Sequence, residues 1–133
     1  MNERMYRTGT AAAVRAWHVM AGPPGPEGER HHHDYRIEVV AGREHVDERG
    51  MVVDLDLLNG ALDRLVGRIQ DADLDELCAE HAGAVTVERF AAWAHAELAA
   101  GLTAPADLEL DVRIWESADA FGGYAAPLPP RVP

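Results

Sequence analysis

The segment His31–Val40, HHHDYRIEVV, alternates in character, and this pattern constrains the fold more than any other feature of the chain. From position 35 onward its odd-numbered positions are apolar, whereas its even-numbered positions are mostly polar or charged. Successive side chains of a β-strand point to opposite faces of a sheet. The segment is therefore predicted to be a half-buried strand, with His31 and His33 on the same face as its apolar residues.

Three further segments are predicted to be strands. Thr8–Val19 mixes Thr, Val and Trp, although its alanine run is also compatible with a helix; Met51–Val53 is a short apolar run; and Leu108–Trp115 alternates. Residues 21–30, AGPPGPEGER, are rich in proline and glycine and predict a loop. The proline-rich tail, residues 125–133, is expected to be irregular.

Two segments carry apolar residues at helical spacing. Leu55–Ile69 follows Asp54, a suitable N-cap residue, and a second helix is predicted to begin after Thr86 and to end at Gly101. The order of elements predicts an α+β domain in which two helices cover one face of a four-stranded antiparallel sheet. A chain of 133 residues suits one domain, residues 1–133. The open edges of such a sheet predict association between subunits.

The composition excludes several classes of function. A net charge of -11 without a long Lys/Arg run argues against binding to nucleic acid. No apolar stretch approaches the roughly 20 residues that span a bilayer, and Met1–Thr10 lacks the apolar region of a signal peptide, so a cytoplasmic protein without membrane association is expected. Cys78 is the sole cysteine, which excludes an internal disulfide and a thiolate cluster, and it is expected to be a small buried hydrophobe.

The histidines are the candidate metal ligands. His31 and His33 leave the same face of one strand, so their ring nitrogens can converge on one ion. Catalytic zinc sites use three protein ligands and leave the fourth position to water or substrate. His18, near the end of a neighbouring predicted strand, is the best third ligand, because three other histidines lie in a charged turn or on helices and are expected to be solvated: His45, His81 and His95. Spacing alone also fits a solvated loop edge or a tag fragment, although a tag is terminal and longer.

The order of several segments resembles the pyruvoyl-tetrahydropterin synthase and carboxytetrahydropterin synthase family over most of the chain. VRAWH matches the family's first zinc histidine at His18, and HHHDYRIEV matches its His-Gly-His-Asn-Tyr signature, which implies ligands at His31 and His33. GMVVDL, residues 50–55, matches the opening of the family's first helix. The resemblance implies the tunnelling fold, a zinc cofactor, and homo-oligomers, trimers or hexamers, with sites at subunit contacts.

Two further segments of the resemblance concern the substrate. VRIWES places the glutamate with which the family grips the pterin ring at Glu116, and VTVERF carries Thr86 and Glu88 at positions that match the start of the family's second helix. A carboxylate at a strand end can accept two hydrogen bonds from an aminopyrimidinone edge. Without the resemblance, Glu116 also fits an exposed strand-end charge, and Thr86 also fits a helix N-cap.

The chain departs from the family at its catalytic residues. The family's synthases use a cysteine just before the histidine pair, and residues 21–30 contain none; Glu27 and Glu29 lie there, and some family members use a glutamate in this region. The family's Asp-His pair maps onto Gln70 and Asp71. Both glutamates also fit a solvated loop, and Asp71 also fits a surface charge at a helix end.

Two functions remain open. The resemblance implies a zinc-dependent lyase-like protein that acts on a pterin or related heterocycle with altered specificity, using Glu27, Glu29 and Asp71. The alternative, motivated by the loss of both the cysteine and the Asp-His pair, is a non-catalytic protein that binds zinc and a pterin or purine-like ligand. A structural protein without a ligand is the third possibility, against which the retained histidines argue.

Overall fold

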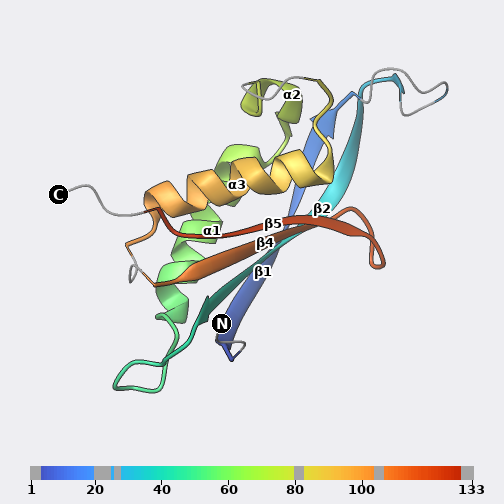
Figure 1. Cartoon of the computed structure of the whole chain (residues 1–133). Coiled ribbons are helices and arrows are strands. Elements are labelled where there is room, and N and C mark those ends of the chain that lie inside the picture. Colours follow the sequence, from blue (N-terminus) through green and yellow to red (C-terminus); the bar gives the residue numbers. More distant parts are fainter. Residues whose placement is uncertain (1–3, 20–24, 26–27, 80–82, 104–106, 130–133) are drawn as a thin grey trace.

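A twisted five-stranded sheet covered by helices on one side forms the protein (Figure 1). The computed structural model describes residues 4–19, 25, 28–79, 83–103 and 107–129. The strands lie in the order β3-β1-β2-β4-β5. The elements along the chain are β1 (Tyr6–His18), β2 (His31–Arg43), α1 (Leu55–Ile69), β3 (Ala72–Asp73), α2 (Leu74–Leu77), α3 (Val87–Gly101), β4 (Glu109–Trp115) and β5 (Phe121–Pro127).

The two longest strands place the histidines at one end of the sheet. β1 and β2 pair antiparallel along their whole lengths, so that His18 lies opposite His31 and Ala16 lies opposite His33. β4 pairs with β2 only from Gly42 to Arg36. Residues 31–35 of β2 therefore extend beyond β4, together with the end of β1.

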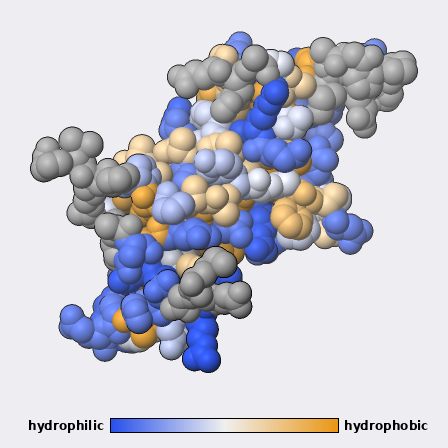
Figure 2. Space-filling model, in the orientation of Figure 1, coloured by the Kyte–Doolittle hydropathy of each residue, from blue (hydrophilic) through white to orange (hydrophobic). Residues whose placement is uncertain are grey.

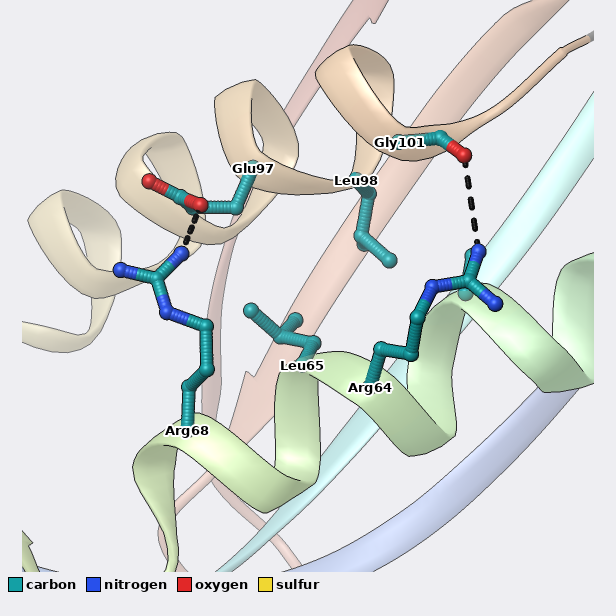
Figure 3. Close-up of a pocket in the computed structure, with 7 residues that line it drawn as sticks. Arg64, Leu65, Arg68, Glu97, Leu98 and Gly101 are labelled. Atoms are coloured by element: carbon teal, nitrogen blue, oxygen red, sulfur yellow. Dashed lines mark hydrogen bonds and ion pairs between the residues drawn. The ribbon is translucent and has the colours of Figure 1, made fainter.

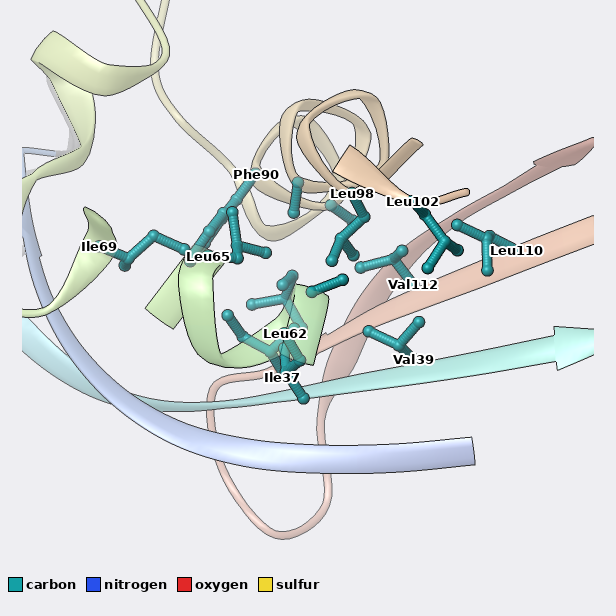
Figure 4. Packing of buried hydrophobic residues seen from close by; sticks show 14 of the residues in the cluster. Ile37, Val39, Leu62, Leu65, Ile69, Phe90, Leu98, Leu102, Leu110 and Val112 are labelled. Carbon is teal, nitrogen blue, oxygen red and sulfur yellow. The ribbon is translucent and has the colours of Figure 1, made fainter. Parts of the chain in front are cut away.

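The core lies between the sheet and the helices (Figure 4). α1 packs on β1, and α3 packs on β4 and β5. Ile37 and Val39 of β2 are fully buried beneath them, which confirms the alternation predicted for this strand. Helix residues whose side chains complete the core include Leu58, Leu62, Leu65, Phe90 and Leu98.

Both long helices begin where the sequence predicts. The carboxylate of Asp54 accepts a hydrogen bond from Asp56 N, and the hydroxyl of Thr86 accepts one from Arg89 N, so each helix has a side-chain N-cap. Gly101 is the last residue of α3 rather than the residue after it. Predictions of these helices were accurate because local caps and periodicity specify both features.

The prediction of a strand at Met51–Val53 is wrong. This segment forms bends that cross from β2 to α1, and Val52 and Val53 are 5% and 7% exposed. The guanidinium of Arg43 donates a hydrogen bond to the Val52 carbonyl oxygen (3.1 Å), which satisfies this group without a neighbouring strand. The short apolar run at residues 51–53 therefore indicates buried side chains, but these residues do not pair with another strand.

β5 was not predicted, and the expected irregular tail 125–133 is wrong over residues 125–127. β5 pairs antiparallel with β4 from Trp115↔Phe121 to Glu109↔Pro127. Its sequence, FGGYAAP, has two glycines and a terminal proline, residues that disfavour strands. Tertiary pairing with β4 overrides this weak local preference.

β3 and α2 were also missed because they are too short to show periodicity. β3 has two residues, Ala72 and Asp73, and pairs parallel with β1 at Ala16 and Trp17. The predicted Pro/Gly loop 21–30 is described only in part, and there the Gly28 N–H donates to the Gly25 oxygen (3.1 Å), as in a turn.

The surface on the α3 side is mixed in character. Figure 2 shows pale and orange residues across the centre, where the alanine-rich α3 runs in Figure 1, with blue hydrophilic residues towards both ends. In the part of the chain that the structure describes, no helix combines the length and the apolar character needed to cross a membrane.

Candidate metal centre

Three histidines from two strands meet at the projecting end of β1 and β2. One ring nitrogen from each of His18, His31 and His33 lies within 4.8 Å of the others. The ring centroids are 4.5 Å apart for His18 and His31, 5.1 Å for His18 and His33, and 4.8 Å for His31 and His33. The structure thus brings together the three residues named from the sequence, because antiparallel pairing puts the end of β1 beside the start of β2.

His18 is oriented by a backbone carbonyl. Its Nδ1 lies 3.2 Å from the oxygen of Val85, which can only accept a hydrogen bond. Nδ1 therefore carries the proton, and Nε2 of the neutral ring presents a lone pair. His18 is 3% exposed, and Nε2 is buried without a hydrogen-bond partner in the described structure. An unsatisfied buried acceptor is costly, and a metal ion at this position would satisfy it.

His31 is oriented in the same way. Its Nδ1 lies 2.7 Å from the oxygen of Glu29, so Nδ1 donates and Nε2 is left with a lone pair. This Nε2 lies 3.1 Å from Nε2 of His33. Either a proton on His33 or a cation bound between the rings makes this approach favourable. Zn–N bonds of about 2.0–2.1 Å in a tetrahedral site place two nitrogens about 3.3 Å apart, so the spacing of the His31 and His33 nitrogens fits such an ion.

Two carboxylates lie near the cluster. Glu116 Oε1 is 4.0 Å from His33 Nε2, and the Glu116 N–H donates to the Ala120 oxygen (3.1 Å), which fixes the turn after β4. Asp75 Oδ2 accepts a hydrogen bond from the N–H of Val19 (3.0 Å), the residue after His18. Their negative charge favours a cation at this end of the sheet.

Tyr35 lies under the cluster. Its ring centroid is 5.4 Å from that of His33 and 5.2 Å from that of Phe90 on α3, in edge-to-face geometry with the latter. Burial raises the pKa of the Tyr35 hydroxyl, and the charges of Glu116 and Asp75 raise it further. Tyr35 is therefore a neutral residue that packs the histidine end of β2 against α3.

The other residues proposed from the sequence lie around this centre or outside it. Thr86 caps α3, and its neighbour Val85 is the residue that contacts His18. Glu88 lies against β5, since a Cβ at Gly122 would be 2.7 Å from Glu88 Oε1. Glu29 is exposed and contacts His31 through its carbonyl oxygen. Glu27 lies outside the described residues.

Asp71 is held against β1 rather than in the cluster. It has a left-handed backbone (φ 59°), and its N–H donates to the Arg15 oxygen (2.7 Å). Gln70 Oε1 accepts a hydrogen bond from Arg15 N (3.2 Å). Arg15 precedes His18 by three residues, about 10 Å along a strand. Within one chain, Gln70 and Asp71 therefore hold the start of β3 beside β1.

The sequence did not reveal the groups that orient the ligands. The oxygens of Val85 and Glu29 belong to the backbone, so the residue types at these positions do not indicate their role. Asp75 has the sequence features of an ordinary charged residue on a helix surface. The expectation that His95 is solvated is wrong: it is 6% exposed, its Nε2 lies 3.1 Å from the Ala126 oxygen, and its ring packs on Tyr124. His45 is exposed as expected, and His81 lies outside the described residues.

A hollow of about 320 Å³ lies beside the projecting part of β2. It is lined by Ala13, Asp34, Tyr35, Arg36, Trp115, Ser117 and Ala118. The side chains of Asp34 and Arg36 leave the face of β2 opposite to the rings of His31, His33 and Tyr35, because successive residues of a strand point to opposite faces. The hollow therefore lies at the turn after β4, on the face of the sheet away from the three histidine rings, and no member of the cluster lines it.

A second cavity, of about 150 Å³, lies between α1 and α3 and shares no residue with the histidine cluster (Figure 3). Arg68 forms an ion pair with Glu97, and Arg64 donates to the Gly101 oxygen at 3.5 Å. These contacts connect the two helices across an apolar floor of Leu65 and Leu98. The cavity is part of the helix packing.

The protein is therefore an α+β domain with a candidate metal centre of three histidines at one end of its sheet. The family model of 6-pyruvoyl tetrahydropterin synthase matches residues 10–126. The chain therefore belongs to the 6-pyruvoyl tetrahydropterin synthase family. A search of curated protein sequences found no significant match.

Solved structures agree on the fold. 6-Pyruvoyl tetrahydropterin synthase from Caenorhabditis elegans matches with a TM-score of 0.76 and 19% identity, over 92% of this chain and 96% of that chain. The Plasmodium vivax enzyme matches with a TM-score of 0.74 and 10% identity, over 94% and 99%. A variant of that enzyme with a catalytic glutamate replaced by alanine matches with a TM-score of 0.75 and 10% identity, over 94% and 99%. The predicted α+β tunnelling fold is confirmed, with five strands in place of four.

Proposed function

We propose that this chain binds one zinc ion through His18, His31 and His33 and acts as a lyase-like protein on a pterin or related heterocycle, with altered specificity. The buried Nε2 of His18 carries this proposal. Its ring is oriented by Val85 so that the only free lone pair meets the other two rings. A solvated loop edge would leave this nitrogen exposed to water, so its burial favours a ligand role.

The proposed heterocycle site lies between the ion and the sheet end. Glu116 Oε1 is 4.0 Å from His33 Nε2, which places a carboxylate beside the proposed ion. The carboxylate of Glu116 is proposed to accept hydrogen bonds from an amino-pyrimidinone edge. Thr86 and Glu88 remain proposed substrate contacts through their position at the start of α3.

The chemistry is proposed to divide between the ion and the loop before β2. Bound zinc supplies Lewis-acid polarisation of a hydroxyl or carbonyl on the side chain of the heterocycle. Glu29, with Glu27 in the same loop, is the proposed proton carrier, and the contact of its backbone oxygen with His31 Nδ1 places the residue beside the cluster. Asp71 could serve the site only from a neighbouring subunit, given its position on Arg15.

A non-catalytic binding protein is the second candidate, and one observation favours it. Gln70 and Asp71, which replace the family's Asp-His pair, are both engaged with the backbone of Arg15. Together with the missing cysteine in residues 21–30, this arrangement leaves the proton-transfer residues of the family without direct equivalents. The same zinc and heterocycle sites would then serve binding alone.

Homo-oligomers, trimers or hexamers, are part of the proposal. β5 forms one edge of the sheet, and β3 covers β1 only at Ala16 and Trp17 in the described structure. Long strand edges with unpaired backbone groups favour pairing with another chain. Light scattering on the purified protein tests this point, and a monomer at micromolar concentration would contradict it.

A titration with neopterin and sepiapterin, followed by fluorescence, tests the heterocycle site in zinc-loaded and metal-free protein. Micromolar binding that requires zinc supports the site, and absence of binding to any pterin would reject it. Chromatographic analysis of incubations with dihydroneopterin and its triphosphate then separates the two candidates. Conversion supports the lyase, whereas binding without conversion supports the binding protein.

A further inference from the structure

The end of β1 that carries His18 is held by a side chain from α2. The ladder between β1 and β2 ends at the pair His18↔His31, so Val19 lies beyond the last cross-strand pair. The N–H of Val19 nevertheless has a partner, because Asp75 Oδ2 accepts it at 3.0 Å. This carboxylate continues the hydrogen bonding of β1 where the sheet stops.

Asp75 is itself fixed relative to β1. Its backbone N–H donates to the carboxylate of Asp73 (2.9 Å), which caps α2, and Asp73 pairs with Trp17 in the parallel β1–β3 ladder. Leu74, between these two aspartates, is fully buried. The short helix is therefore anchored to the same strand whose end it supports.

His18 thus has two supports from different parts of the chain. The backbone oxygen of Val85, before α3, accepts a hydrogen bond from the His18 ring at Nδ1. The carboxylate of Asp75, on α2, accepts a hydrogen bond from the backbone N–H of Val19. The first contact fixes the rotation of the ring, and the second fixes the backbone from which the ring projects. A strand end without a partner frays, so both contacts favour the orientation in which Nε2 points at His31 and His33.

We propose that Asp75 is a positioning residue of the metal centre, which holds the backbone after His18 so that its Nε2 points at the ion, and is not itself a ligand. The inference rests on the proposed metal site. Asp75 Oδ2 is engaged by Val19, and the ligand group identified among the described residues comprises the three histidines alone. Groups that orient metal ligands typically change affinity by about 10- to 100-fold when removed.

Three variants separate a positioning role from a charge effect. Asp75→Ala removes the acceptor, Asp75→Asn keeps an acceptor oxygen without the charge, and Val19→Pro removes the N–H donor and keeps the carboxylate. Proline at position 19 favours extended backbone at His18, which is already in a strand. Glu76→Ala, an exposed change on the same helix, is the matched control.

Zinc affinity is measured for each variant by competition with a chelator, and cobalt spectra report the geometry of the ligands. Asp75→Ala and Val19→Pro are expected to lose about tenfold or more in affinity and to show an altered cobalt spectrum. Asp75→Asn and Glu76→Ala are expected to stay within about threefold of the unchanged protein. The double variant, Asp75→Ala with Val19→Pro, should lose no more zinc affinity than either single variant, because the two changes remove the same hydrogen bond.

The Val19 amide provides a readout that needs no metal. In metal-free protein its proton resonance should lie downfield and exchange slowly, and Asp75→Ala should abolish both properties while Asp75→Asn retains slow exchange. Unchanged affinity in Asp75→Ala would overturn the inference, and so would an equal loss in Asp75→Asn, which would assign the effect to charge. If Asp75→Ala does not fold, the zinc affinities of Val19→Pro and Asp75→Asn still distinguish a positioning role from a charge effect. Absence of zinc from the unchanged protein would instead reject the proposed function itself.

Discussion

The Nε2 atoms of His31 and His33 lie 3.1 Å apart, although the Nδ1 proton of His31 is committed to the Glu29 oxygen. Two ring nitrogens approach so closely only when a proton or a cation lies between them. His18 adds a third nitrogen, buried and without a partner in the described structure. A cation at that point would give all three nitrogens a partner.

Zinc should stabilise the folded chain. A ligand that binds only the native state adds about 2.7 kcal/mol when its free concentration is 100 times Kd. The midpoint of thermal unfolding should then rise on the order of 10 °C with zinc and fall again after chelation. Calorimetry measures the change, with His33→Ala as the control that should not respond. An equal response in that variant would place the ion elsewhere.

Glu116→Ala should weaken pterin binding and leave zinc in place. The carboxylate is 4.0 Å from His33 but is proposed to bind the heterocycle, and hydrogen bonds to a charged group contribute about 1.5–3 kcal/mol. The dissociation constant should rise about tenfold to hundredfold. Fluorescence titration and metal analysis of the same samples check both points. Glu109→Ala, at the opposite end of β4, should change neither; loss of zinc in Glu116→Ala would contradict the assignment.

Cys78 should be unreactive in the native protein. Burial raises the pKa of its thiol to about 12, with Asp75 and Glu97 adding to the shift. At pH 8 only about one thiol in ten thousand is then a thiolate, the reactive form. Because the folded pKa is above the unfolded value of 9.0, the stabilising contribution is complete below pH 9 and is lost as the pH rises towards 12. Iodoacetamide should modify the chain only in denaturant, and rapid modification of native protein would refute the buried position.

Phe90→Ala should be one of the most destabilising single changes. Phe90 is 1% exposed and packs edge-to-face on Tyr35, so its removal leaves a cavity between α3 and the histidine end of the sheet. The expected loss is about 3–5 kcal/mol of unfolding free energy. Phe121→Ala, at a residue that is 50% exposed beside Trp115, should cost less than about 1.5 kcal/mol. Urea denaturation compares them, and similar losses would contradict the described core.

The sequence predicted the elements whose signals are local. Leu55–Ile69 and the start at Val87 follow from N-cap residues and helical periodicity, which do not depend on distant parts of the chain. The strand at Met51–Val53 was wrong because an apolar run shows burial without showing what pairs with it. β5 was missed because it depends on tertiary pairing with β4, and its glycine-rich sequence does not itself predict a strand.

The same distinction applies to the site. His31 and His33 could be placed together because alternation along one strand fixes their common face, and His18 joined them through the neighbouring strand. The carbonyls of Val85 and Glu29 could not be found from residue types. Asp75 could not be found either, because its role depends on where a four-residue helix lies against the end of β1.

The zinc content of tag-free protein shows whether His18, His31 and His33 hold an ion. Metal analysis should find about one zinc per chain in the unchanged protein and in His45→Ala, which changes an exposed histidine in a turn, and almost none in His33→Ala. Circular dichroism confirms that the variants remain folded. Zinc-free protein after expression with added zinc, or retention of zinc by folded His33→Ala, would contradict the three-histidine centre.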